Sequence, residues 1–271
     1  MRRASLVVWA VLGLGTWISE LALANPGVDC IPVPSGLVAW WPGDGDADDI
    51  DGGNHGVLKN GTTFGAGLVV DAFVFDGVDD YVEVPDSDLW AFGMNEFTID
   101  LWVQFDSLRP STIANPQVVF IGNDESPGSQ NKWTFAFGGG VLYWHINSPD
   151  LGPIFLALAS FSPAVGQWYH LAVTRSGTTY TTYVDGVAIA SESDANPVPN
   201  ANAPLTIGQA ESAGFGQDFF MHGRIDEVEI FYRALLASEI QAIVNAGSAG
   251  KCRPTTSGRQ TTWGQVKSIY R

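Results

Sequence analysis

The segment FTIDLWVQF, residues 97–105, decides the fold, because apolar and polar side chains alternate along its whole length. Successive side chains of a β-strand point to opposite faces of the sheet. The odd-numbered positions from Phe97 to Phe105 are all apolar and would share a buried face, while Asp100 and Trp102 would lie on the other face. The segment WYHLAVTR, residues 168–175, alternates in the same way. The pattern predicts strands that each turn one face toward a common core.

Similar short segments recur about every ten residues between positions 36 and 233, separated by clusters of Gly, Pro, Asn and Asp that are typical of turns. Further strands are predicted at 36–41, 72–75, 81–84, 118–121, 132–137, 142–146, 179–184, 187–190, 205–208 and 225–232. About a dozen strands in one domain imply two packed antiparallel sheets. Long loops are expected at 106–131, 147–166 and 191–204.

Two local signals refine this all-β prediction. Asp185-Gly186 stands between two predicted strands and indicates a tight hairpin, because a two-residue turn of this kind needs positive φ at both positions. One short helix is expected near the C-terminus, at Ser238–Asn245. Ser238 would cap its start and Gly247 would end it.

The charge balance argues against two classes of partner. The 271 residues contain 13 basic and 29 acidic side chains, which gives a formal net charge of -16. A protein with this balance is not expected to bind nucleic acid or an anionic membrane. The acidic surface favours solubility and divalent cations instead.

The sequence predicts a cleaved leader at the N-terminus and a flexible tail at the C-terminus. Met1-Arg2-Arg3, the apolar run 6–14 and the small residues before position 25 are typical of a secretory signal peptide spanning 1–24. An uncleaved membrane anchor is the alternative. We expect a secreted or cell-surface domain at 25–252 that has no transmembrane anchor after cleavage. Residues 253–271 form a flexible basic tail that ends in WGQVKSIYR, which is either disordered or a recognition peptide for sorting.

Cys30 and Cys252 are the two cysteines of the chain, and they lie just inside the ends of the expected domain. In an exported protein such a pair most simply forms a disulfide that ties the termini together. Two free thiols or a metal-binding pair are the alternatives.

The order and spacing of six segments resemble the laminin-G-like jelly roll family of concanavalin A-like β-sandwiches, over roughly residues 36 to 246. The segments are LVAWWPGDGDADDIDGGNHG, AFVFDGVDDYVEVP, FTIDLWVQF, WYHLAVTRSGTTYTTYVDGV, LTIGQ and GRIDEVEIFYRALLASEIQAIV. The resemblance implies a two-sheet antiparallel jelly roll. It also implies that the opening and closing segments are neighbouring strands, which would bring Cys30 close to Cys252.

An acidic loop follows the first predicted strand. It contains Asp44, Asp46, Asp48, Asp49 and Asp51, followed by the segment GGNHG at 52–56. Carboxylate and amide oxygens on a Gly-rich backbone are the ligands that Ca²⁺ prefers. The loop lacks the Glu and the flanking helices of an EF-hand, so that motif is excluded.

The resemblance places the acidic loop near the last strand, and it implies Asp44 and Asp226 as ligands of a structural Ca²⁺. Asp48 and Asn54 complete the predicted metal site. The alternative is a solvated loop in which the Asp side chains form Asx turns. The segment Asp76–Asp80 indicates a hairpin tip, with a second calcium site as the other possibility.

Asp226, Glu227 and Glu229 invite comparison with laminarinase-like glycosidases, which carry acids on one face of a strand. Arg224 stands where a further acid would be needed, and strict alternation places Asp226 on the face opposite Glu227 and Glu229. The sequence also has no nucleophile elbow, phosphate loop or zinc-like His spacing. We therefore expect no catalytic residues.

Aromatic side chains are the remaining candidates for ligand binding. Trp102 and Trp144, beside Asp100 and Asn147, could line a concave sheet on which sugar rings stack. The alternative is a second apolar layer under loops. The sequence thus predicts a secreted, non-catalytic module that binds a polysaccharide, a glycoconjugate or another surface protein. A glycoside hydrolase or lyase, or an adhesive protein without a small ligand, are the other hypotheses.

Overall fold

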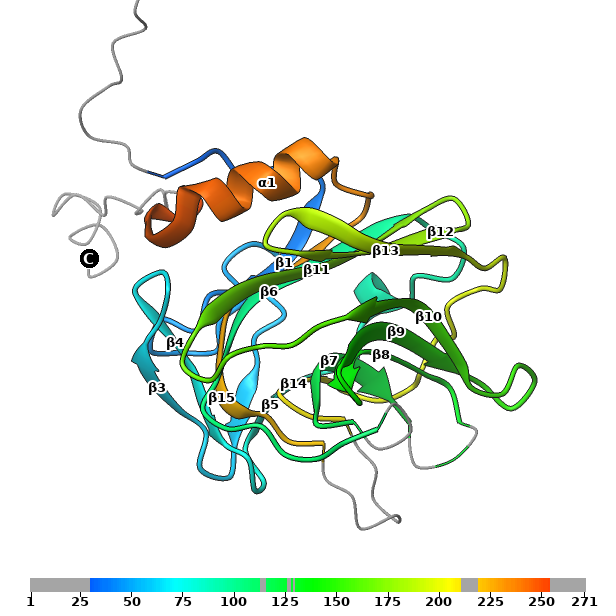
Figure 1. Ribbon diagram of the computed structural model, residues 1–271, viewed down its shortest axis with the longest axis horizontal. Coiled ribbons are helices and arrows are strands. Elements are labelled where there is room, and N and C mark those ends of the chain that lie inside the picture. Colours follow the sequence, from blue (N-terminus) through cyan, green and yellow to red (C-terminus); the bar gives the residue numbers. More distant parts are fainter. Residues whose placement is uncertain (1–29, 113–115, 126–127, 129, 211–218, 254–271) are drawn as a thin grey trace, which may run out of the picture.

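Two antiparallel sheets face each other across one apolar core in the computed structural model, which describes residues 30–112, 116–125, 128, 130–210 and 219–253 (Figure 1). In these ranges the eight-stranded sheet has the order β13-β12-β11-β6-β15-β4-β3, with β1 also paired to β15. The seven-stranded sheet has the order β10-β9-β8-β7-β14-β5-β2. The predicted all-β, two-sheet jelly-roll architecture is confirmed.

The strand bounds are as follows. The eight-stranded sheet contains β1 (Leu37–Trp41), β3 (Thr63–Ala66), β4 (Asp71–Asp76), β6 (Phe97–Phe105), β11 (Trp168–Ser176), β12 (Thr179–Val184), β13 (Val187–Ser193) and β15 (His222–Phe231). The seven-stranded sheet contains β2 (Val57–Lys59), β5 (Tyr81–Val84), β7 (Val118–Asp124), β8 (Lys132–Gly138), β9 (Val141–Asn147), β10 (Ile154–Ser160) and β14 (Leu205–Ile207).

Strand β6 has the bounds that alternation predicts, and it lies between β11 and β15. Its apolar positions, from Phe97 to Phe105, belong to the core between the sheets. There they meet aromatic side chains of the seven-stranded sheet, such as Trp144, whose ring centroid lies 5.0 Å from that of Phe97. Burying such rings on both inner faces supplies the main driving force for the sandwich.

Helix α1 (Ala237–Ala246) covers part of the outer face of the eight-stranded sheet (Figure 1). Its apolar side chains Ile240 and Ile243 pack in a separate cluster with residues of β11, β12 and β15. Gly247 ends the helix with a φ of 52°, as predicted. The prediction of Ser238 as N-cap is wrong: the helix begins one residue earlier, and the Glu239 carboxylate accepts a hydrogen bond from the Leu236 amide at 2.8 Å.

The hairpin at Asp185-Gly186 is confirmed, with φ values of 49° and 80°. The expected loop at 147–166 is partly wrong, because it contains β10. Ala157 has a φ of 50°, and the register of β10 against β9 shifts between Leu156 and Ala159. This irregularity breaks the alternation that would have identified the strand.

Cys30 and Cys252 form the disulfide, with their Cα atoms 4.9 Å apart. Next to it, Ile31 and Lys251 form a parallel bridge. The alternatives of free thiols or a metal-binding pair are therefore ruled out. The expected signal peptide at 1–24 and the tail beyond Arg253 lie outside the described residues. No helix in the described ranges is long and apolar enough to cross a membrane.

Candidate functional site

A bulge in β15 changes the expected arrangement of its acidic residues. Asp226 pairs with Trp102 of β6, whereas Glu229 pairs with Asp100, so β15 has one extra residue at this point. Glu227 occupies the bulge with a φ of 54°. The extra residue resets the alternation, and Asp226 and Glu229 both lie on the outer face of the sheet. The prediction that Asp226 faces the opposite side is therefore wrong.

These acids are buried beneath the chain terminus. The Lys251 ammonium lies 3.2 Å from Glu229 Oε1 and 3.8 Å from Glu227 Oε2, and its side chain is 2% exposed. The Trp40 indole donates a hydrogen bond to Glu227 Oε2 at 3.0 Å, and its ring faces the ammonium at 5.6 Å. The acids of β15 are thus packed against the protein's own groups rather than lining an open cleft.

Burial dominates the ionisation of this cluster because a carboxylate loses its hydration there. It raises the pKa of Asp226 to about 8 and that of Glu227 to about 7, with hydrogen bonds and Lys251 opposing the shift. Burial also holds the pKa of Glu229 well above its ordinary value, against the attraction of Lys251. The charged form of these carboxyls is therefore disfavoured even with Lys251 beside them.

Asp44 and Asp226 are both fixed to the turn between β3 and β4. Asp226 Oδ2 accepts hydrogen bonds from the amides of Leu68 and Val69 at 2.8 and 2.9 Å. Asp44 Oδ1 accepts one from the Asp71 amide at 2.9 Å. Asp226 Oδ1 is buried without a hydrogen-bond partner, and Asp44 Oδ2 forms no hydrogen bond but is ion-paired with Arg253. Buried oxygens left in this way fit the requirements of a cation.

The other two residues of the predicted metal site do not join this pair through any contact in the described ranges. Asp48 is exposed and pairs with His55 at 3.1 Å. Asn54 donates to Asp49 Oδ2 at 2.9 Å. Asp49 is the structural centre of the acidic loop: burial opposes its ionisation, but hydrogen bonds from backbone amides hold its pKa below the ordinary value. Of the four predicted ligands, Asp44 and Asp226 are the two that the structure ties to the segment between β3 and β4.

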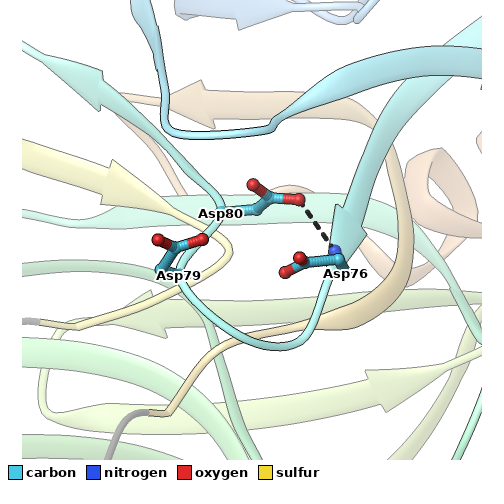
Figure 2. A group of neighbouring side chains, drawn as sticks. All are labelled: Asp76, Asp79 and Asp80. Atoms are coloured by element: carbon cyan, nitrogen blue, oxygen red, sulfur yellow. Dashed lines mark hydrogen bonds between the residues drawn. The ribbon is translucent and has the colours of Figure 1, made fainter.

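Asp76, Asp79 and Asp80 gather at the tip between β4 and β5 (Figure 2). Their oxygens lie within 4.8 Å of one another, which in the described ranges holds for no other group of three potential metal ligands from His, Cys, Asp and Glu. Asp80 accepts hydrogen bonds from the amides of Gly61 at 2.6 Å and Asp76 at 2.9 Å. The expected hairpin tip is wrong, because β4 belongs to the eight-stranded sheet and β5 to the seven-stranded sheet. The segment is a turn that crosses from one sheet to the other, and the two hydrogen bonds to Asp80 hold it together.

The predicted aromatic platform is not formed. Trp102 is 7% exposed and packs edge-on against His170, on the outer face of the eight-stranded sheet. Asp100 is buried there and lies 3.0 Å from His170 Nε2. Trp144 points into the core, where it stacks on Trp133. The prediction failed because alternation identifies the outer face but not what covers it.

Asn147, the fourth predicted ligand residue, lies instead on the outer face of the seven-stranded sheet. Its Oδ1 is buried and has no hydrogen-bond partner. On the same face the ring of His145 stacks on that of Phe155, with centroids 4.5 Å apart. Both residues are partly exposed. Burial lowers the pKa of His145 to about 4, so this face presents a neutral imidazole at physiological pH.

A buried ion pair supports this end of the seven-stranded sheet. Lys132 of β8 lies 2.7 Å from Asp124 of β7, and Lys132 is paired in register with Asn147 of β9. Sequence reasoning missed His145 and Phe155, because β10 was expected to be a loop. It also missed Lys251, whose only signal was its position next to Cys252.

Comparison with solved structures finds similar folds in binding domains. Domain 4 of AbnA, a GH43 extracellular arabinanase from Geobacillus stearothermophilus, in complex with arabinotriose, has a TM-score of 0.62 and 20% identity over 76% of this chain and 96% of that one. The binding domain of Paraclostridial Mosquitocidal Protein 1 has a TM-score of 0.61 and 19% identity, over 78% of this chain. The receptor-binding domain of botulinum neurotoxin type G has a TM-score of 0.56 and 14% identity, again over 78%.

This chain spans about half the length of the two toxin domains, with 52% and 51% covered. At these identities the similarity shows the fold alone. None of the curated proteins compared with the chain matches it. The family model described as the concanavalin A-like lectin/glucanases superfamily matches residues 76–241, which is more than half of the chain. Together with the two-sheet sandwich, this match shows that the chain belongs to the concanavalin A-like lectin/glucanases superfamily.

Proposed function

We propose that this protein is a secreted, non-catalytic recognition module that binds a glycan or glycoconjugate at a cell surface, and that a Ca²⁺ ion stabilises one end of its sandwich. The fold and the similar binding domains support this class of function. The burial of Glu227 and Glu229 under Lys251 supports ligand binding without hydrolysis, because these acids cannot reach a glycosidic bond in this arrangement.

The observation that carries the proposal is the partly exposed His145–Phe155 stack. A partly exposed aromatic pair offers an apolar face on which a sugar ring can pack. The imidazole is neutral, as suits an uncharged ligand. Ligand binding at this position would use the outer face of the seven-stranded sheet.

A glycan array tests this site. We expect the wild-type chain to bind a defined set of oligosaccharides, and Phe155→Ala to weaken that binding about fivefold, because one stacking contact contributes about 1 kcal/mol. Ile189→Ala, which changes an exposed side chain of the eight-stranded sheet, should leave binding unchanged. An empty array would favour an adhesive protein without a small ligand. Oligosaccharides that Phe155→Ala binds as tightly as the wild type would show that the binding site lies elsewhere on the protein.

The calcium proposal rests on Asp44 and Asp226, whose buried oxygens fit a cation. When bound, the ion would neutralise these carboxylates and hold the β3–β4 turn against β15. At about 100 times its Kd, such an ion adds about 2.7 kcal/mol to the free energy of unfolding. In a domain of this size we therefore expect a rise in Tm of about 5–10 °C.

Thermal melts with Ca²⁺ and with EDTA check this expectation. Asp226→Asn should abolish the rise in Tm without lowering the Tm in EDTA. The Asp226 carboxyl, with a pKa of about 8, is largely uncharged at neutral pH without the ion, and the Asn oxygen can still accept the hydrogen bonds from Leu68 and Val69. Asp76→Asn, in the acidic turn of Figure 2, is the matched control and should keep the response. A wild-type Tm that does not change with Ca²⁺ would contradict the assignment of the ion to Asp44 and Asp226. So would a calcium-dependent rise in Tm that is lost in Asp76→Asn but kept in Asp226→Asn.

A further inference from the structure

The side chain of Arg253 bridges two buried carboxylates that come from distant parts of the chain. Its Nη2 atom is ion-paired with Asp44 Oδ2, in the acidic loop, and lies 3.4 Å from Glu227 Oε1, in the β15 bulge. The Asp44 and Glu227 side chains are 13% and 1% exposed. A single nitrogen of the guanidinium therefore lies where a cation would contact both carboxylates.

Arg253 differs from its neighbour Lys251 in how firmly it is held. Lys251 is enclosed between Glu229, Glu227 and the Trp40 ring, so its removal would leave two buried carboxyls without their cation. The Arg253 side chain is 37% exposed. It can turn into solvent while Cys252, held by its disulfide, keeps the backbone in place.

From this geometry we infer that Arg253 is a built-in competitor of Ca²⁺, which occupies part of the cation site and must leave Asp44 when the ion binds. The inference rests on the proposed calcium site. Asp44 Oδ2 cannot contact the guanidinium and coordinate a metal ion at the same time, because both cations require the same face of the carboxylate.

Competition of this kind sets the calcium concentration at which the site fills. If the ion pair is closed about nine-tenths of the time, the apparent Kd for Ca²⁺ is about ten times the intrinsic value. Because the two contacts exclude each other, a saturating concentration of Ca²⁺ displaces Arg253 from Asp44.

Two measurements on the full chain test the inference, with Ca²⁺ itself as the probe. In calorimetric titrations we expect Arg253→Gln to bind Ca²⁺ about ten times more tightly than the wild type. In spectra of the ¹⁵N-arginine-labelled protein, the Nε–H signal of Arg253, assigned by its loss in Arg253→Lys, should shift to a solvent-exposed position as Ca²⁺ saturates the site.

Arg224→Gln is the matched control for a general charge effect. Arg224 lies close to the same turn, where it donates a hydrogen bond to the carbonyl of Ala66 at 3.3 Å, but it contacts neither Asp44 nor Glu227 in the described residues. An equal gain in affinity in Arg224→Gln, or an Arg253 signal that does not move at saturation, would overturn the inference.

The failures of the two proposals are distinguishable. If Ca²⁺ binds the wild type in a manner that Asp44→Asn abolishes, but Arg253→Gln has wild-type affinity, then the competition is refuted and the calcium site stands. If neither the wild type nor Arg253→Gln binds Ca²⁺, both fail. Binding detected in Arg253→Gln but not in the wild type would support strong competition.

Discussion

Reduction of the Cys30–Cys252 disulfide is expected to lower the free energy of unfolding by about 5 kcal/mol. The bond joins residues separated by 222 positions, so it restricts almost the whole described chain in the unfolded state. Loop-closure entropy grows with the length of the closed loop, which places this bond near the upper end of the usual range. For a domain of this size, the corresponding fall in Tm is about 10–20 °C.

Thermal melts of the wild type with and without reductant, and of a Cys30→Ser/Cys252→Ser double variant, measure this effect. The chain has two cysteines, so the reductant changes one bond and should leave the melting curve of the double variant unchanged. The reduced wild type should melt like the double variant. A difference of less than about 1 kcal/mol between the oxidised and reduced forms would show that the termini stay together without the covalent bond.

Substitution of Lys251 by Met is expected to cost about 3–5 kcal/mol at neutral pH, because it leaves buried Glu229 and Glu227 without their ammonium partner. This loss of stability should become smaller as the pH is lowered toward 5. Both carboxyls have folded-state pKa values above their ordinary values, so the folded form takes up protons across this range and the repulsion between them disappears.

Chemical denaturation of three variants measures the Lys251 effect. Lys251→Met/Glu229→Gln should recover part of the lost stability, because the second change removes the unpaired charge. Lys59→Met is the surface control: Lys59 lies 2.8 Å from Glu83 with a side chain 32% exposed, and its loss should cost less than about 1 kcal/mol. A Lys251→Met variant as stable as Lys59→Met would show that the buried pair contributes little.

The sequence predicted the fold well where regular alternation is sufficient. Strands such as β6 can be recognised from their sequence alone, because the side chains facing the core are all apolar whereas some of those on the outer face are polar. The resemblance to a laminin-G-like jelly roll then predicted that the ends of the chain are neighbours, and the disulfide confirms it. Strands β2 and β3 were missed because three or four residues are too short to show a period.

The candidate sites were harder to predict, because their geometry depends on local irregularities and on what covers each face. The bulge at Glu227 places Asp226 on the same face as Glu229, which strict alternation had excluded. No feature of the segment DEVE predicts a positive φ at Glu227. Trp102 lies on the outer face as predicted, yet it is buried there. Asp44 and Asp226 were named from the resemblance, and the structure ties both to one turn.

The most direct test of the central claim is mass spectrometry of an oligosaccharide from the array after prolonged incubation with the wild-type chain. If the protein binds glycans without changing them, the sugar should be recovered at its original mass, and native spectra should contain its intact complex, weakened by Phe155→Ala. Shortened or unsaturated sugar products that form with the folded chain but not with the heat-denatured one would contradict the account.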